Sequence, residues 1–292
     1  MNVPNTVILS PTRVAGALKC FRKHVLSEVL GQTPNDAHQP ALDFGDMMHR
    51  AAGVFWLHGY DVAREYLIAN FSTPFNEKHT PELAHKLLAV YASGAKLMPF
   101  GGDEWVIETL EQRLSCDVPF GTLTFQIDRL LRNTNTQQLA LVDLKTASRT
   151  DARWERQWPR SLQMKLYSEC VARHYGTPLS WLIIEGLDKT KGVLAYLSLP
   201  EVSAEKRAES WHAVEWVARH DSQLLDACRL PDGSIDADRL IDLALTQTPT
   251  NESECFTYGS QCDFLPLCDA EPSERIALLR AGYHYEQPKH LV

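Results

Sequence analysis

The sequence predicts an α/β protein in which a central mixed β-sheet is flanked by helices. Three observations lead to this prediction. Helix-period patterns fill about residues 10–100, strand-period patterns run from Trp105 to Lys145, and a helix, two strands and a long helix follow. The length of 292 residues suits one large domain. We expect a single domain (1–292) with a helical N-terminal part (10–100), a sheet core (101–200) and a helical, Cys-rich C-terminal part (201–292).

Composition and charge narrow the classes of function. Hydrophobic residues make up 44% and charged residues 23%, as in ordinary soluble proteins. No apolar run approaches the ~20 residues of a membrane helix, and residues 1–6 lack the features of a signal peptide. We therefore expect a cytoplasmic protein. The net charge of −8 argues against a general nucleic-acid coat protein, but it does not exclude an enzyme that grips DNA locally.

The N-terminal pattern begins as a capped helix. Ser10 is a suitable N-cap, Pro11 suits the first helical position, and apolar residues recur at helical spacing until Gly31. Cys20 lies within this pattern. A lone buried Cys is usually core filler, so a second feature is needed before it counts as a ligand.

A second helix is predicted from about Ala41 to His58. It carries Gly45 and His49 on one face, and a Gly one turn before a His lets a ligand approach the ring. The simpler interpretation of His49 is a hydrogen-bonded His. Two further helices and a break follow, at 61–70, 80–97 and Gly101-Gly102.

Two apolar runs separated by the polar segment 132–138 predict a β-hairpin. A turn centred between residues 135 and 136 places Asp128 opposite Asp143. Like charges at such a pair destabilise a sheet, so these carboxylates need a cation. We interpret them as a metal site with Lys145 beside it. On the preceding strand, Glu108 and Glu111 fit a solvated face better than the site.

The segment after Thr146 is rich in arginine and tryptophan: Arg149, Arg153, Trp154, Arg156, Trp158 and Arg160. Such a mixture suits a single-stranded nucleic-acid track and equally a solvated loop whose two Trp rings pack on the core. A helix is predicted over 158–175, with Gln163 and Tyr167 on one face. Two strands and two helices follow, at 180–185, 192–199, 203–228 and up to about 244.

Three cysteines, Cys255, Cys262 and Cys268, fall within 14 residues. A thiolate cluster needs four ligands, and the candidates for the fourth are Cys20, Cys116, Cys170 and Cys228. The spacings are wide for zinc and suit an iron–sulphur cluster better.

Taken in chain order, the motifs of this sequence resemble those of the PD-(D/E)xK nuclease superfamily. The matching residues are Gly45-x-x-x-His49, Ile127-Asp128, Asp143-x-Lys145 and Gln163-x-x-x-Tyr167. Within that superfamily it is similar to the RecB-type exonucleases with an iron–sulphur cluster, which include the nuclease domain of AddB, CRISPR-associated adaptation nucleases and phage relatives. Cys20, Cys255, Cys262 and Cys268 match the layout of the cluster ligands. The resemblance implies a restriction-endonuclease-like core.

The resemblance also implies roles. His49, Asp128, Asp143 and the carbonyl of Leu144 would bind Mg²⁺ or Mn²⁺, and Asp128, Asp143 and Lys145 would be catalytic. Gln163 and Tyr167 would contact the DNA strand. Cys20, Cys255, Cys262 and Cys268 would hold a structural 4Fe-4S cluster.

We therefore expect a metal-dependent DNA exonuclease that acts on single strands or strand ends. Recombination or CRISPR-adaptation proteins are the expected partners. One alternative is a non-catalytic DNA-binding or assembly subunit with a degenerate nuclease fold; such relatives lose the Lys or one Asp. Another is a zinc-stapled module of unrelated function.

Overall fold

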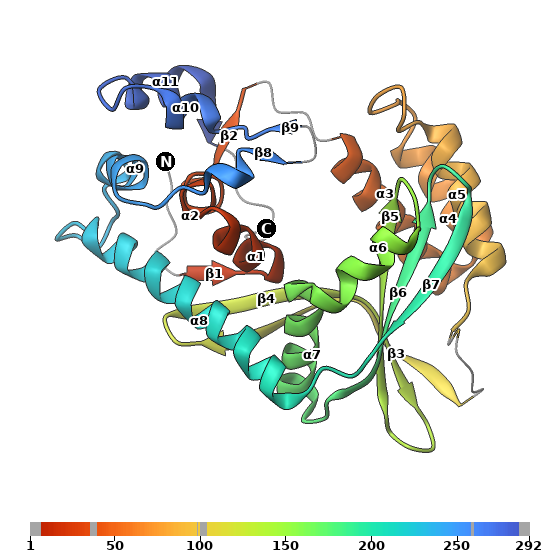
Figure 1. Cartoon of the computed structure of the whole chain (residues 1–292). Helices are drawn as coiled ribbons and strands as arrows, with labels where there is room; N and C mark the ends of the chain where they lie inside the picture. The colour runs from red at the N-terminus through yellow and green to blue at the C-terminus, as the bar shows by residue number, and fades with distance from the viewer. Residues whose placement is uncertain (1–6, 36–39, 98, 100–103, 258–259, 286–292) are drawn as a thin grey trace. The chain divides into compact units, whose positions relative to one another are not determined.

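The computed structural model describes the whole chain except residues 1–6, 36–39, 98, 100–103, 258–259 and 286–292 (Figure 1). As predicted, the fold is a mixed central sheet flanked by helices. The strand order is β1 (Val7–Leu9), β4 (Gly121–Asn133), β5 (Leu139–Ala147), β6 (Leu179–Asp188) and β7 (Val193–Leu199), and β3 (Trp105–Val118) pairs with β4. The chain divides into two compact units. One comprises Met1–Ala37, Ser115–Phe125 and Glu205–Val292; the other comprises His38–Leu114 and Gln126–Ala204. Within the described part of the chain, we find no helix with the length and hydrophobicity of a membrane span.

The second unit carries the centre of the sheet. Its helices are α3 (Pro40–His58), α4 (Tyr60–Asn70), α5 (Pro81–Gly94), α6 (Ala152–Gln157), the 3-10 helix η2 (Trp158–Arg160) and α7 (Leu162–Tyr175). Its strands are β3 (Trp105–Val118), β4 (Gly121–Asn133), β5 (Leu139–Ala147), β6 (Leu179–Asp188) and β7 (Val193–Leu199), of which β3 and β4 run on into the first unit.

The β4–β5 hairpin has the predicted register. Its antiparallel pairs run from Arg132↔Leu139 to Arg129↔Val142, and the next position in this register opposes residues 128 and 143. The turn forms because the side-chain oxygen of Asn133 accepts hydrogen bonds from the backbone N–H groups of residues 135 and 136. On its other side β5 pairs with β6 in parallel, so both neighbours of β5 are sheet strands.

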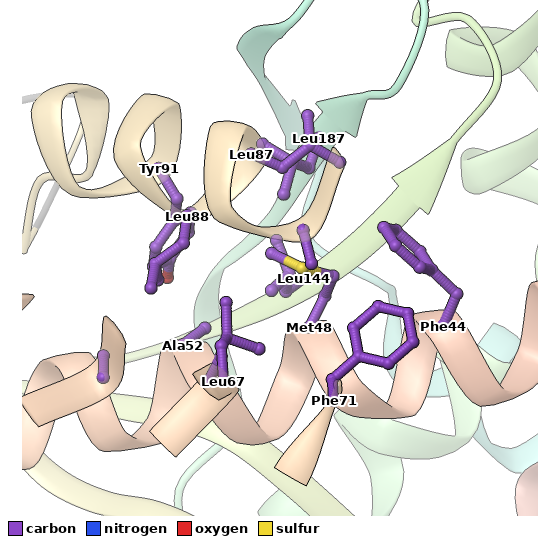
Figure 2. Close-up of a cluster of buried hydrophobic side chains, with 13 residues drawn as sticks. Phe44, Met48, Ala52, Leu67, Phe71, Leu87, Leu88, Tyr91, Leu144 and Leu187 are labelled. Atoms are coloured by element: carbon purple, nitrogen blue, oxygen red, sulfur yellow. The ribbon is translucent and has the colours of Figure 1, made fainter. Parts of the chain in front are cut away.

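Helices α3, α4 and α5 pack onto β5 and β6 around a buried apolar cluster (Figure 2). Leu144 of β5 and Leu187 of β6 point into the same cluster as Met48 of α3 and Leu87 of α5. All four side chains are 3% exposed or less. Each fully buried side chain of this kind contributes roughly 1.5–3 kcal/mol, so the packing fixes α3 against the strand that carries the predicted site.

The first unit contains both ends of the described chain. Its helices are α1 (Pro11–Lys19), α2 (Phe21–His24), the π-helix η1 (Val25–Val29), α8 (Ala204–Ala227), α9 (Ala237–Thr246), the 3-10 helix η3 (Glu252–Glu254), α10 (Leu265–Asp269) and α11 (Arg275–Gly282). Its strands are β1 (Val7–Leu9), β2 (Gln32–Pro34), β8 (Phe256–Thr257), β9 (Ser260–Gln261) and β10 (Tyr283–Tyr285).

The N-terminal helix differs from its prediction. Ser10 caps it and Pro11 begins it, as expected, but the single helix up to Gly31 is wrong because Cys20 has extended backbone (φ −149°, ψ 106°). The interruption is stabilised by the segment before η3. The backbone N–H of Arg22 donates to the carbonyl of Pro249, and Asn251 donates to the carbonyl of Lys19.

Two other local predictions need correction. Residues 32–34, between the two predicted N-terminal helices, form β2 and pair with β10, a partner far away in the sequence. Part of the segment after Thr146, for which a nucleic-acid track and a solvated loop were both considered, is the short helix α6. This helix begins because Asp151 accepts hydrogen bonds from the first backbone N–H groups. The Gly101-Gly102 break lies outside the described residues.

Candidate active site

His49, Asp128 and Leu144 meet where α3 lies beside the hairpin. His49 Nδ1 is 3.1 Å from Asp128 Oδ2, and the backbone N–H of Leu144 donates to the same oxygen at 2.7 Å. The carboxylate of Asp128 therefore accepts a hydrogen bond from a backbone N–H of β5, just beyond the last described pair of β4 and β5. His49 and Asp128 are 24% and 18% exposed, so a ligand can reach both.

Asp143 and Lys145 form the second half of the site. Lys145 Nζ lies 3.0 Å from Asp143 Oδ1 and 2.8 Å from Oδ2. The two side chains meet because residues two apart on a strand share a face. Asp143 is only 2% exposed and Lys145 is 22% exposed, so the ammonium group is the more accessible end of the pair.

The carboxylates have different proton affinities. Burial raises the pKa of Asp143 to about 6, and the charge of Asp128 adds to this effect while Lys145 opposes it. Burial would also raise the pKa of Asp128, but His49, Lys145 and the Leu144 amide outweigh it and the net shift is downward. Burial would lower the pKa values of His49 and Lys145; the neighbouring carboxylates nevertheless raise both. The neighbouring carboxylates thus favour the protonated forms of His49 and Lys145.

Helix α7 presents its predicted pair to the same site. Gln163 Nε2 donates to Tyr167 Oη at 2.9 Å. Burial raises the pKa of Tyr167, and the charges of Asp143 and Asp128 raise it further. The phenol therefore stays protonated at neutral pH, and it lies close enough for the charges of both carboxylates to raise its pKa.

Glu111 on β3 is a member of the site that sequence reasoning placed on a solvated face. It lines one small hollow together with His49 and Asp128, and Gln126 donates to its Oε2 at 2.7 Å. Its backbone has φ 50°, uncommon for a non-Gly strand residue. Burial raises the pKa of Glu111 to about 7, with a further contribution from Asp128. Glu108 instead pairs with Arg132 at 2.9 Å, as a partly solvated strand residue does.

A glycine on α3 makes room for Glu111. A Cβ built on Gly53 would lie 2.9 Å from Glu111 Cγ, closer than real contacts allow. The sequence did contain a signal for this residue. Gly53 lies four positions after His49, and residues four apart share a helix face, so Gly53 marks a place where another side chain can approach the face that carries His49.

The same hollow extends to a buried polar network around Arg129. Arg129 Nη2 is 2.7 Å from Glu185 Oε1, and Nη1 donates to Tyr91 Oη at 3.1 Å. Tyr91 in turn donates to Glu185 Oε2 and accepts from Trp56 Nε1, while the guanidinium lies 4.2 Å over the Trp56 ring. The network ties the residue after Asp128 to β6, α5 and α3.

The donor atoms of this site suit a hard divalent cation. The carboxylate of Asp128 lies beside a His nitrogen and the Leu144 backbone, and Asp143 is close enough for the charge of Asp128 to raise its pKa. Oxygen donors are what Mg²⁺ and Mn²⁺ prefer. In the arrangement of the described residues, no three His, Cys, Asp or Glu groups converge closely enough to hold an ion. Instead, His49 pairs with the carboxylate of Asp128, and Lys145 pairs with that of Asp143.

The four predicted cluster cysteines all lie in the first unit. Cys20 sits at the break between α1 and α2, and the backbone N–H of Cys262 donates to the carbonyl of Cys255. Burial raises the pKa of Cys255, and the nearby Cys262, Cys268 and Cys20 raise it further. The donor set fits a thiolate-bound cluster in its chemistry, although the described thiols do not converge as a metal site.

The remaining cysteines are placed elsewhere. Cys170 and Cys228 are buried, in α7 and just after α8, and Cys116 belongs to β3. None of the three contributes to the shift of the Cys255 pKa among its leading causes. The charge of Cys20, by contrast, is among the causes that raise the pKa values of both Cys255 and Cys268.

The chain is similar to one protein family and, in part, to solved structures. The profile of the PD-(D/E)XK nuclease superfamily matches residues 8–269. No curated protein matches the chain. Among solved structures, one titled "Crystal structure of SSO0001" is 13% identical, covers 75% of this chain and 78% of its own, and has a TM-score of 0.35. With the family profile spanning nearly the whole sheet and its flanking helices, the chain belongs to the PD-(D/E)XK nuclease superfamily, and its mixed sheet is that superfamily's restriction-endonuclease-like fold.

Proposed function

We propose that this protein is a metal-dependent DNA exonuclease that digests single strands or strand ends. One observation carries the proposal. Asp128 and Asp143 lie on adjacent strands in the predicted register, with Lys145 at 2.8 Å from Asp143 and His49 at 3.1 Å from Asp128. A degenerate relative that only binds DNA would not need to retain the whole set.

The side chains of His49, Asp128 and Asp143 and the carbonyl of Leu144 would hold Mg²⁺ or Mn²⁺. Bound there, such an ion supplies a water of lowered pKa and offsets negative charge on the scissile phosphate. Asp143 contributes a buried carboxylate that is ionised above a pH of about 6. The site therefore gains its second negative charge near neutral pH.

Lys145 acts as a charged donor in this proposal. Burial would lower its pKa, but the charges of Asp143 and Asp128 raise it, so the ammonium keeps its proton at neutral pH. A protonated Lys stabilises negative charge that develops on a phosphate, and it orients a water through its N–H groups. It is a poor proton acceptor.

Gln163 and Tyr167 would contact the strand near the scissile phosphate. Tyr167 is 7% exposed, so it holds the Gln163 side chain by hydrogen bond rather than reaching far out. Gln163 is the more exposed member and offers its amide to the DNA backbone.

The test is digestion of single-stranded oligonucleotides carrying a label at the 5′ or 3′ end, with Mg²⁺ or Mn²⁺. Asp143→Asn and Lys145→Met should each reduce the rate by at least about 100-fold, the scale of one preorganised charged group. Asp61→Asn, at an exposed position of α4, is the control and should keep the wild-type rate. Chelation should stop digestion by the wild-type protein.

Two outcomes would contradict the proposal. Full activity of both site variants would remove the catalytic assignment. Binding of DNA by the wild-type protein without any digestion, with either metal and either end, would favour the non-catalytic subunit instead.

We further propose that Cys20, Cys255, Cys262 and Cys268 hold a structural 4Fe-4S cluster. The mutual influence of these four thiols supports it. Protein purified without oxygen should be brown, absorb near roughly 400 nm and contain iron and sulphide. A colourless protein with one zinc per chain would contradict this part without touching the nuclease proposal.

The same proposal covers the wider setting. The whole chain would act as one nuclease domain in the cytoplasm, with DNA as substrate and with recombination, repair or CRISPR-adaptation proteins as partners. Its finer placement within the RecB-type group depends on the cysteine site.

A further inference from the structure

Trp158 stands beside the candidate active site on the 3-10 helix η2. Lys145 Nζ lies 6.0 Å from the centre of its ring. The ring is partly exposed, and its Nε1 has no hydrogen-bond partner among the described residues. Trp154 meets it edge-on, with ring centres 5.7 Å apart and planes at 74°.

The two tryptophans of this segment differ in what they do. Trp154 is buried, and a Cβ built on Gly186 of β6 would lie 2.6 Å from its ring atoms. It therefore anchors α6 against the sheet. Trp158 is held in place by Trp154, and neither of the described core clusters includes it. The ring is therefore partly exposed next to Lys145, while its Nε1 is buried.

The surroundings of Trp158 are basic. Arg153, Arg156 and Arg160 are exposed along α6 and η2, and Arg149 is exposed just before α6. Of the two acidic residues in this stretch, Asp151 is used as the helix N-cap. In a chain of net charge −8, four exposed arginines beside one active-site Lys form a local attraction for phosphates.

We propose that Trp158 is a stacking site for a nucleobase of single-stranded DNA, at the nucleotide adjoining the scissile phosphate. This inference rests on the proposed nuclease function and names its substrate contact. A phosphate at Lys145 and a base on Trp158 are separated by a distance that one or two nucleotides span, since the rise per nucleotide is about 3.4 Å. A base stacks on the ring only after it leaves a duplex, so the site selects single strands or frayed ends. The arginines bind the phosphates that lead away from it.

The test measures equilibrium binding of fluorescent oligothymidylates to the full-length protein under chelation, so that no digestion intervenes. One strand is intact, and others carry an abasic position at successive places from the end. The wild-type protein should bind one abasic strand about tenfold more weakly than the intact strand. Trp158→Ala should bind the intact strand about tenfold more weakly and should no longer distinguish it from that abasic strand.

Two variants control the experiment. Trp158→Phe keeps an aromatic face and should recover most of the lost affinity. Trp181→Ala removes another partly exposed Trp, in β6, and should bind and discriminate as the wild-type protein does. Circular dichroism spectra should match across all variants. In digestion assays, Trp158→Ala should raise KM for single strands more than it lowers kcat.

The stacking site is overturned if the wild-type protein binds intact and abasic strands equally at every position, or if Trp158→Ala still discriminates. Failure of the nuclease proposal looks different. The wild-type protein would then discriminate against an abasic strand through Trp158 and yet digest no strand with either metal.

Discussion

At the scale of single residues, three carboxylates in one small region hold protons to different degrees. The pKa of Asp128 is lowered, that of Asp143 is raised to about 6 and that of Glu111 is raised to about 7. Burial acts on all three, and what separates them is their partners. Asp128 has an imidazole and a backbone amide, and Asp143 has an ammonium. Glu111 accepts a hydrogen bond from the neutral amide of Gln126, and the charge of His49 opposes its shift less strongly than that hydrogen bond does.

The Glu111 shift makes stability depend on pH. Its pKa is higher in the folded state than the ordinary value of about 4.3, so the folded protein binds more protons than the unfolded chain between pH 4 and 7. The free energy of unfolding therefore falls as pH rises through this window. Glu111→Gln removes that penalty and should be more stable than the wild-type protein at pH 8, by about 1 kcal/mol after allowance for solvent screening.

The measurement is urea unfolding at pH 4.5 and pH 8 with a chelator present. The difference between Glu111→Gln and the wild-type protein should be larger at pH 8. Glu108→Gln is the comparison, because the Arg132 hydrogen bond lowers the pKa of Glu108 and its substitution should favour the wild-type protein at pH 8. A Glu111→Gln effect that is equal at both pH values would contradict the shift.

At the scale of secondary-structure elements, the Arg129 network connects the strand of Asp128 with the helix of His49. Arg129 and Glu185 are 3% and 1% exposed, so each neutralises a charge that water does not reach. Breaking such a pair on one side leaves the other charge buried without compensation, which costs about 3–5 kcal/mol. The network should therefore set the spacing of β4, β6 and α3.

Arg129→Met should accordingly lower the free energy of unfolding by about 3 kcal/mol or more. Arg132→Met is a matched control three residues further along β4. Its pair with Glu108 is 25% and 30% exposed, so the loss should stay below about 1 kcal/mol. The check is chemical denaturation followed by circular dichroism.

The double variant Arg129→Met with Glu185→Gln refines the test. Its loss of stability should be smaller than the sum of the losses of the two single variants. Each single substitution leaves one buried charge unpaired, whereas the double substitution removes both charges. Equal losses for Arg129→Met and Arg132→Met would show that burial of the pair has no special importance.

At the scale of the whole molecule, the candidate active site and the four cysteines belong to different compact units. His49, Asp128, Asp143 and Lys145 all lie in the second unit, and the four cysteines all lie in the first. In the first unit, Arg22 of α2 contacts the C-terminal segment. It donates to the carbonyl of Thr248 at 3.0 Å and approaches Cys268 Sγ at 3.9 Å.

Loss of the cysteine site should therefore affect the stability of the folded protein more directly than its catalytic step. Cys268→Ser should contain less iron and unfold at a temperature lower by at least about 5 °C, since a bound group stabilises only the folded state. Calorimetry and iron analysis provide the check. Cys170→Ser, at a buried cysteine of α7, is the control and should keep its iron. Unchanged iron in Cys268→Ser would contradict the assignment.

The sequence by itself determined the features that depend on neighbours in the chain. Alternation, turn residues and helix caps act over a few positions, so the β4–β5 hairpin, its register and the Ser10 cap could be predicted. The same locality placed Gln163 one turn before Tyr167. The superfamily followed from the order of these short motifs and was confirmed by the family profile.

Only the tertiary structure decided what depends on segments distant in sequence. Glu111 joins the site because Gly53 of α3 leaves room for it, and β2 exists because β10 pairs with it. The helix breaks at Cys20 because residues 249–251 take its free backbone groups. Trp154 and Trp158 look alike in the sequence, and only packing against Gly186 distinguishes the buried anchor from the partly exposed ring. Long-range burial and hydrogen bonding leave no periodic trace in the chain, so the sequence cannot reveal them.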